Sequence, residues 1–132
     1  MPATGSVLLD TSVVVAVLRR VPGVKERLSS AEELLVPFVA LGELEYGANL
    51  ARPLERQREA VRTFMEGATL LLPTERTATE YGRIKAALKA AGTPLPENDV
   101  WIAACALEHG LPLATRDAHF AHVSGLTVLD WR

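Results

Sequence analysis

The sequence alternates between short apolar runs and longer segments in which apolar residues recur at helical spacing. The short runs, which predict buried strands, are residues 6–9, 33–36, 68–72, 111–115 and 126–129. The longer segments predict helices at 13–18, 24–31, 37–50, 54–66, 75–91 and 100–109, with a short helical turn after Asp117. Alternating strands and helices are typical of a mainly parallel sheet covered by helices on both faces. We therefore expect a three-layer α/β/α sandwich with about five strands.

The length of 132 residues suits a single domain spanning residues 1–132. The composition, 48% apolar and 5% aromatic, favours helices packed on buried strands. Cys105 lies inside an apolar helix and is expected in the core, and a single cysteine indicates a reduced, cytoplasmic setting. Residues 1–6 lack the basic start of a secretory leader. No apolar run approaches the roughly 20 residues of a membrane span, so no membrane association is expected.

Three of the four aspartates lie where a predicted strand and a predicted helix meet. Asp10 directly follows the first strand, and Asp117 follows the fourth. Asp99 is expected to begin the helix at 100–109, whose far end leads into the fourth strand, so Asp99 should lie near the end of that strand. Ligands of open parallel sheets bind at the carboxyl ends of the strands. We therefore expect the three carboxylates to converge there.

A fourth acid, Glu43, interrupts the small and apolar face of the helix at 37–50. At helical spacing this face comprises Val36, Val39, Ala40, Glu43, Leu44 and Gly47. The carboxylate of Glu43 should point inward, whereas Glu45, about 200° around the helix, should point outward. An unpaired buried charge costs several kcal/mol, and a cation is its natural partner. We call Asp10, Glu43, Asp99 and Asp117 the acidic quartet.

Each member of the acidic quartet also has a simpler explanation. Each aspartate stands where a helix N-cap would stand, and Glu43 alone would usually be a half-exposed helix residue. Capping, however, does not require that the caps meet at one edge of the sheet.

No cysteine or histidine pair has the spacing of a zinc site, and His109, His119 and His122 are expected at the surface. A cluster made only of carboxylates selects hard ions such as Mg²⁺ or Mn²⁺.

The charge of the chain bears on its substrate. A net charge of −2 argues against a protein that coats nucleic acid, but a nucleic-acid enzyme can combine an acidic site with an arginine rim. Eleven of the fourteen basic residues are arginine, which suits phosphate recognition, although solvated helix faces explain them equally.

Four segments, in this order, resemble the PIN-domain proteins and most closely the VapC-type toxins of bacterial toxin–antitoxin pairs. They are residues 7–12 (VLLDTS), 40–48 (ALGELEYGA), 98–104 (NDVWIAA) and 113–117 (LATRD), with Phe120 after them. The resemblance implies a compact α/β/α fold that hydrolyses RNA phosphodiester bonds with Mg²⁺ or Mn²⁺. It matches the acidic quartet to the four acids of the family and Thr115 to its small hydroxyl residue. It also implies a homodimer, inhibited by an antitoxin whose tail enters the active-site groove.

The expected chemistry is attack of a metal-activated water on an RNA phosphate. Asp10 and Asp99 would hold the principal ion, and the other two members of the quartet would complete its shell and orient or deprotonate the water. Ser12 and Thr115 would either fix carboxylate rotamers or merely cap local turns.

Three other functions compete with this interpretation. A receiver-type signalling domain needs a lysine after its fifth strand, where this chain has Asp130, Trp131 and Arg132. A haloacid-dehalogenase-like phosphatase needs a second aspartate two residues after its nucleophile, where Ser12 stands. A catalytically inactive PIN-like binding module remains the third, although the complete acidic quartet argues against it.

An apolar stripe runs along the helix at 75–91, near two further apolar residues. Together they are Ala78, Tyr81, Ile84, Leu88, Leu95 and Trp101. Such a stripe is either a surface shared with another subunit or an antitoxin tail, or ordinary core packing.

Overall fold

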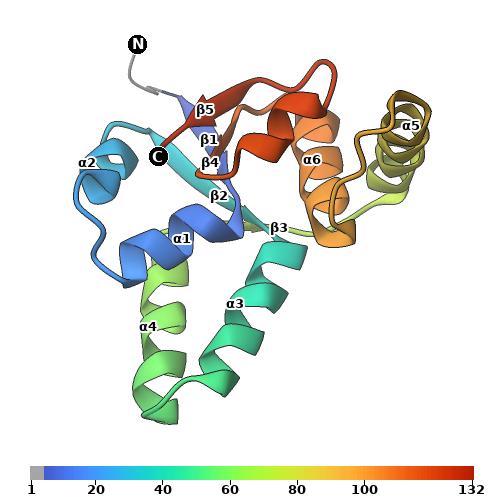
Figure 1. The fold of residues 1–132 in the computed structure, drawn as a ribbon. Coiled ribbons are helices and arrows are strands. Elements are labelled where there is room, and N and C mark those ends of the chain that lie inside the picture. The colour runs from blue at the N-terminus through green and yellow to red at the C-terminus, as the bar shows by residue number, and fades with distance from the viewer. Residues whose placement is uncertain (1–4) are drawn as a thin grey trace.

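The computed structural model describes residues 5–132 and shows a sheet flanked by helices (Figure 1). In chain order the elements are β1 (Ser6–Leu9), α1 (Thr11–Leu18), α2 (Val24–Ser29), β2 (Glu33–Pro37), α3 (Phe38–Leu50), α4 (Leu54–Glu66), β3 (Thr69–Leu71), α5 (Glu75–Ala91), α6 (Glu97–His109), β4 (Leu113–Thr115), the 3-10 helix η1 (Ala118–His122) and β5 (Val128–Asp130). Every element expected from the sequence is present, in the expected order. Residues 1–4, which belong to the expected domain and to the segment tested for a leader, lie outside the described residues.

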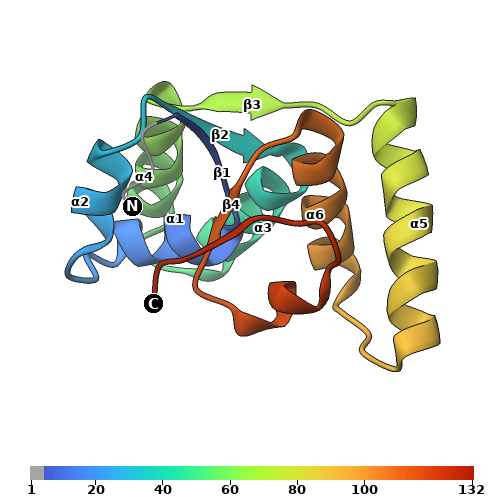
Figure 2. The same ribbon diagram turned by 90° about the horizontal axis from the view of Figure 1, so that it is seen from above.

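All five strands are parallel and lie in the order β3-β2-β1-β4-β5. Figure 2 shows α1, α2 and α4 on one side of the sheet and α5 and α6 on the other. The expected three-layer sandwich is therefore confirmed. The chain adds β2 and β3 on one side of β1, and β4 and β5 on the other. Such a reversal of strand order leaves a crevice at the carboxyl ends of the two central strands, where ligands bind.

The core lies around the central strands. Leu8, Leu9 and Leu113 are fully enclosed, and α6 packs nearby through a run of small buried residues. Cys105 of α6 is 6% exposed, and burial raises the pKa of its thiol to about 12, so it is a core residue as expected. None of the helices in residues 5–132 is both long and apolar enough to cross a membrane.

Helix α6 begins three residues earlier than the sequence suggested, at Glu97, with Pro96 as its N-cap. The fixed φ of proline and the two acids in the first turn favour this start, because negative charge stabilises a helix N-terminus. The backbone N–H of Asp99 donates to the Pro96 carbonyl at 3.0 Å. Asp99 therefore lies inside the first turn, and the expectation that it stands at the N-cap is wrong.

The remaining differences are at the ends of elements. Bounds shift by one or two residues in α1, α2, β2, α3, β3, β4 and β5. The strand β5 begins at Val128, two residues later than expected, because a turn precedes it. Gly125 adopts a φ of 83°, and the Leu126 N–H donates to the Val123 carbonyl at 3.4 Å. Because of this turn, β5 begins later in the chain than expected and ends at Asp130.

The buried face of α3 differs slightly from the expected one. Its buried residues are Ala40, Leu44 and Ala48, which are four residues apart. Gly47, expected on this face, is exposed. Residues four apart form a row that is inclined to the helix axis. The buried face of α3 follows this row, so it includes Ala48 and leaves Gly47 exposed.

The apolar stripe of α5 is mainly core packing. The buried residues of α5 are Thr77, Ile84 and Leu88. Ala78, expected on the same face, is exposed. Tyr81 is half-buried and stacks on Trp101 of α6, with ring centroids 3.8 Å apart. Ile84 and Leu88 are therefore used inside the chain and are not available to a partner.

A buried carboxylate joins α5 to α6. Glu108, near the end of α6, is 8% exposed and accepts hydrogen bonds from the hydroxyls of Thr74 and Thr77. Thr74 is the N-cap of α5, and Thr77 completes a capping box with it. Burial alone would raise the pKa of Glu108, but the two hydroxyls bring it below its ordinary value of 4.5. Ionised Glu108 therefore stabilises the start of α5.

We predict that Glu108→Gln lowers the free energy of unfolding by about 1.5–3 kcal/mol at pH 7, because the charged acceptor of two hydroxyls is lost. Since the pKa of Glu108 is lowered in the folded state, its contribution is fully present above about pH 4.5 and is lost as the pH falls through the folded pKa. Urea unfolding at pH 7 and pH 3 measures both effects.

The control variant is Glu59→Gln, which removes an exposed carboxylate that pairs with Arg62 on the surface. It should cost less than about 1 kcal/mol. Equal costs for Glu108→Gln and Glu59→Gln would contradict the role assigned to Glu108.

Candidate active site

Asp10 lies directly after β1 at the centre of the sheet and is 4% exposed. Its Oδ1 accepts hydrogen bonds from the Ser12 hydroxyl at 2.6 Å and the Val13 N–H at 3.2 Å. Its Oδ2 accepts one from the Thr115 hydroxyl at 2.6 Å. Burial raises the pKa of Asp10 and the charge of Asp117 adds to this, although the three donors oppose the increase. Asp10 is thus both the N-cap of α1 and a carboxylate held in one orientation.

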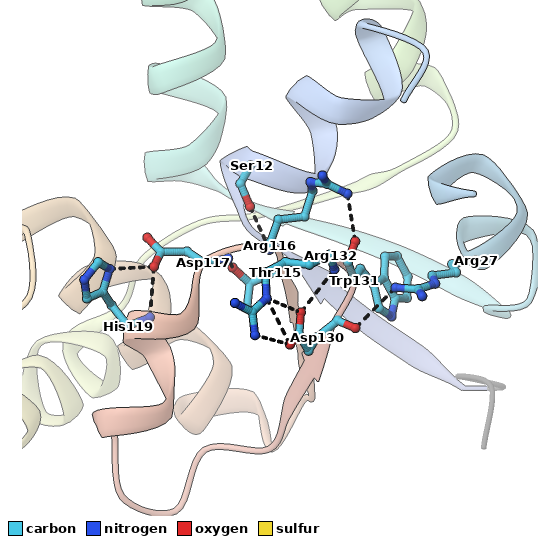
Figure 3. Close-up of polar contacts among 9 residues, drawn as sticks. All are labelled: Ser12, Arg27, Thr115, Arg116, Asp117, His119, Asp130, Trp131 and Arg132. Carbon is cyan, nitrogen blue, oxygen red and sulfur yellow. Dashed lines mark hydrogen bonds and ion pairs between the residues drawn. The ribbon is translucent and has the colours of Figure 1, made fainter. Parts of the chain in front are cut away.

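The two hydroxyls that hold Asp10 also hold the chain after β4 (Figure 3). Ser12 Oγ accepts a hydrogen bond from the Arg116 N–H at 3.0 Å, and Thr115 Oγ1 accepts one from the Asp117 N–H at 2.9 Å. The carboxyl ends of β1 and β4 are therefore linked through side chains at the crevice. This linkage brings Asp10 and Asp117 together, as the positions of the strand ends predicted.

Asp117 is the N-cap of η1. Its Oδ1 accepts a hydrogen bond from the His119 N–H at 2.9 Å and lies 2.6 Å from His119 Nδ1. Both contacts use the same carboxylate oxygen. His119 is exposed, as expected, and so are His109 and His122.

Glu43 reaches the same region from α3. The hydroxyl of Thr11, the first residue of α1, donates to Glu43 Oε1 at 2.5 Å. Thr11 follows Asp10 directly, so this contact fixes α3 against the start of α1. Glu43 is half-buried and Glu45 is exposed, as the helical spacing predicted.

Asp99 lies in the first turn of α6 and is half-buried. Burial, and then the negative charges of Asp117, Glu43 and Asp10, raise the pKa of Asp99 to about 6, against a smaller opposing effect of His119. Each of the other three carboxylates is therefore close enough to act on Asp99. The structure brings all four predicted residues to the carboxyl edge of the sheet.

The acidic quartet converges without forming a closed coordination shell. Within residues 5–132, no three acidic, histidine or cysteine side chains are close enough together to hold a metal ion in the present arrangement. Four like charges repel one another. Ions such as Mg²⁺ keep several water ligands and take only one or two protein carboxylates directly. Carboxylates spaced along the carboxyl edge of the sheet therefore fit an ion that is bound partly through water.

Sequence reasoning missed two polar residues at this site. The contact of Thr11 with Glu43 joins distant parts of the chain, so no local pattern signals it. The contact of His119 with Asp117 is local, and a donor two residues after an N-cap aspartate is a recognisable signal. Both contacts leave the second oxygen of the carboxylate for other partners.

The chain matches the PIN domain family over residues 7–126. It is similar to Ribonuclease VapC1 of Haemophilus influenzae strain R2866, with 30% identity covering 94% of this chain and 96% of the relative. It is also similar to the tRNA(fMet)-specific endonuclease VapC of Shigella flexneri, with 31% identity and the same coverage. A structure of DNA-bound VapBC from Salmonella typhimurium matches with a TM-score of 0.90 and 28% identity, covering 96% of this chain and 98% of the other.

We predict that Asp99→Asn raises the melting temperature in EDTA at pH 8. The folded-state pKa of about 6 lies above the ordinary value of 3.8, so the ionised carboxylate destabilises the fold. This cost grows as the pH rises between the two values and is complete above the higher one. We expect a gain of about 1–2 kcal/mol at pH 8, after allowance for screening by solvent, and little gain at pH 4.

Thermal melts of the parent and the variant at the two pH values measure this effect. Glu45→Gln is the matched control, because it removes an exposed carboxylate from α3 and should leave both melts unchanged. If Asp99→Asn melts below the parent in EDTA at pH 8, the carboxylates do not repel one another as described.

Proposed function

The chain belongs to the PIN-domain family, among the VapC-type endoribonucleases of toxin–antitoxin pairs, and we propose that the acidic quartet is its RNA-cleaving site. One observation carries this proposal: the pKa of Asp99 is raised by burial and by the other three carboxylates. Mutual repulsion of this kind lowers the stability of a fold. Perturbed carboxylates gathered at a crevice are therefore best explained by function.

We propose Mg²⁺ or Mn²⁺ as the cofactor. PIN-domain VapC ribonucleases generally depend on a divalent metal. The donors of the acidic quartet are all carboxylate oxygens, which suit hard ions better than zinc. When bound, such an ion lowers the pKa of a water molecule and offsets charge on the phosphate.

Within the quartet, Asp10 and Asp99 are the residues we assign to the ion. Ser12 and Thr115 position Asp10 by donating to its two oxygens, so its carboxylate cannot rotate away. Asp99 gains most from a cation, because burial and the other three carboxylates destabilise its ionised form, which predominates at neutral pH.

Glu43 and Asp117 are the residues we assign to the attacking water. The contacts with Thr11 and His119 use Oε1 of Glu43 and Oδ1 of Asp117. The second oxygen of each carboxylate can orient the water and accept its proton. The water oxygen then bonds to phosphorus, the bond between phosphorus and the leaving ribose oxygen breaks, and that oxygen takes up a proton from solvent.

We also propose an antitoxin as the protein partner. The chain is similar to VapBC-1 of nontypeable Haemophilus influenzae, with a TM-score of 0.86 and 29% identity over 96% of this chain, and to VapBC-5 of Mycobacterium tuberculosis, described as a member of a family of toxin-antitoxin systems. The Shigella relative is named for tRNA(fMet), so this transfer RNA is the first substrate to test.

A second copy of the chain is the other partner we propose. Phe38 is 52% exposed and Leu72 is 60% exposed. Phe38 lines an apolar hollow together with Leu71, Pro73 and Trp101, and Leu72 lies between two of these residues in the chain. Exposed apolar surface of this kind is typical of protein contacts.

We predict that Asp10→Asn, Glu43→Gln and Asp99→Asn each reduce RNA cleavage about a hundredfold or more, because each removes a charge that holds the ion or directs the water. Glu45→Gln should cleave like the parent, since it is on the same helix as Glu43 but points to solvent. Cleavage of labelled tRNA(fMet) and of unstructured RNA measures the rates, and far-ultraviolet circular dichroism checks the fold of each variant.

The same assay tests the ion. Cleavage should stop in EDTA, return with Mg²⁺ or Mn²⁺, and not require Zn²⁺. Full activity in EDTA would exclude the proposed chemistry, and equal losses in Glu43→Gln and Glu45→Gln would exclude the role of Glu43. A folded, metal-loaded parent that cleaves none of these RNAs would favour the inactive binding module.

We predict a dimer in solution at micromolar concentration, measured by light scattering without an antitoxin. Leu72→Asp should shift the protein to monomer, because it places a charge inside the proposed contact. Leu50→Asp is the control, since Leu50 is 67% exposed on α3, outside the residues that line the hollow. A monomeric parent would contradict the proposed assembly.

A further inference from the structure

We propose that Arg132 binds a backbone phosphate of the RNA beside the acidic quartet, and that Asp130 is a positioning residue that holds the guanidinium there. This inference rests on the proposed function, because it adds a substrate contact to the same site. It depends on the placement of residues 130–132, on the geometry of the ion pair within them and on the charges around them.

The segment is fixed beside the chain that carries Asp117. Strand β5 pairs with β4 so that Asp130 lies opposite Thr115. The Trp131 N–H donates to the Thr115 carbonyl at 2.8 Å, and Arg116 Nη1 donates to the Trp131 carbonyl at 2.9 Å. Arg132 and Asp117 each follow this last pair of the ladder by two residues.

Figure 3 shows this arrangement: the guanidinium of Arg132 lies with the Asp130 carboxylate next to Thr115 and on the side of Asp117. The charge of Asp117 is near enough to raise the pKa of Arg132, after the larger effect of Asp130. The positive group therefore borders the acidic quartet.

The ion pair holds the guanidinium in one orientation. Arg132 Nε lies 3.0 Å from Oδ1 and 3.1 Å from Oδ2 of Asp130, and Nη2 lies 2.6 Å from Oδ2. The backbone N–H of Arg132 also donates to Oδ1 at 3.1 Å, and these contacts with Arg132 bring the pKa of Asp130 to about 2.

The Arg132 guanidinium also has N–H donors that do not contact Asp130. The contacts with Asp130 use Nε and Nη2, and in the part of the chain that the structure describes, no hydrogen bond is made by Nη1. The side chain of Arg132 is 58% exposed. Arginine presents five N–H donors in a planar fork that suits phosphate oxygens, so Nη1 can bind a phosphate while Asp130 keeps its place.

The charges around this segment favour an anion. Arg27 Nη1 donates to the Asp130 carbonyl at 3.2 Å, and Arg116 donates to the carbonyl of Trp131. Two of the three guanidinium groups at the segment thus bind neutral carbonyls, and the third pairs with Asp130. A phosphate approaching four carboxylates needs compensating positive charge, which this side of the crevice supplies.

The first test is RNA binding in an Asp99→Asn background, which prevents cleavage during the measurement. Fluorescence anisotropy with a labelled single-stranded RNA gives the Kd between 50 mM and 300 mM salt. Loss of one phosphate contact should reduce the slope of log Kd against log salt concentration by about 0.7, and weaken binding about fivefold at 0.1 M salt. We expect both effects for Arg132→Gln.

Arg83→Gln is the matched control. Arg83 lies on α5, is also 58% exposed and also pairs with a nearby carboxylate, that of Glu80. The two variants remove the same charge from surfaces of equal exposure. If Arg83→Gln changes the slope and the Kd as much as Arg132→Gln, only the net charge matters and the proposal is overturned.

Two further variants separate position from charge. Asp130→Asn makes the segment more positive but releases the fork, so we expect weaker RNA binding with an unchanged slope. Tighter binding by Asp130→Asn would overturn the positioning role. Arg132→Lys keeps the charge without the fork, and it should restore the slope while recovering only part of the affinity.

Cleavage kinetics provide a readout that a loss of folding would not reproduce. In the otherwise unaltered chain, Arg132→Gln should raise KM more than it lowers kcat, because the contact is to a phosphate beside the one that is cleaved. An unaltered KM would overturn the proposal.

If Asp10→Asn cleaves like the parent, the proposed function itself fails. If acidic variants are inactive and Arg132→Gln behaves like Arg83→Gln, only the role of Arg132 fails.

Discussion

The carboxylate of Asp10 lies between the carboxyl ends of the central strands β1 and β4, and Asp10 is only 4% exposed. A buried carboxylate requires hydrogen-bond donors, and here these are the hydroxyls of Ser12 and Thr115 and one backbone N–H. The same hydroxyls accept N–H groups from the chain after β4, so they set the position of Asp117 as well. The order of strands makes this possible, because it brings β4 beside β1. The arrangement of the site thus follows from the hydrogen bonds that stabilise the buried carboxylate of Asp10.

Two carboxylates on α6 show how surroundings decide the role of an acid. Glu108 accepts hydrogen bonds from two threonine hydroxyls, which bring its pKa below the ordinary value, and it stabilises the start of α5. Asp99, at the other end of the helix, is half-buried and near three further acids, and burial and then these charges raise its pKa to about 6. The first arrangement adds to the stability of the fold, whereas the second lowers it, and the proposed cation would offset that loss.

The sequence predicted the fold and the positions of the acids well, because both depend on local pattern. Alternating strands and helices identify a parallel sheet, and the aspartates after β1 and β4 are then at its carboxyl edge. Helical spacing separates Glu43 from Glu45 in the same way. The error at Asp99 arose because Pro96 begins α6 earlier than the apolar pattern does. Contacts such as Thr11 with Glu43 depend on how α1 and α3 pack, which no local pattern contains.

The central claim is that the acidic quartet holds a divalent ion, and titration of the protein with Mn²⁺, followed by electron paramagnetic resonance of the free ion, tests it most directly. The measurement requires no RNA, so it separates ion binding from cleavage. We expect the parent and Glu45→Gln to bind Mn²⁺ with the same affinity, and Asp99→Asn to bind it at least about tenfold more weakly. Equal Mn²⁺ affinity in the parent and Asp99→Asn, or no binding by the parent, would contradict the account.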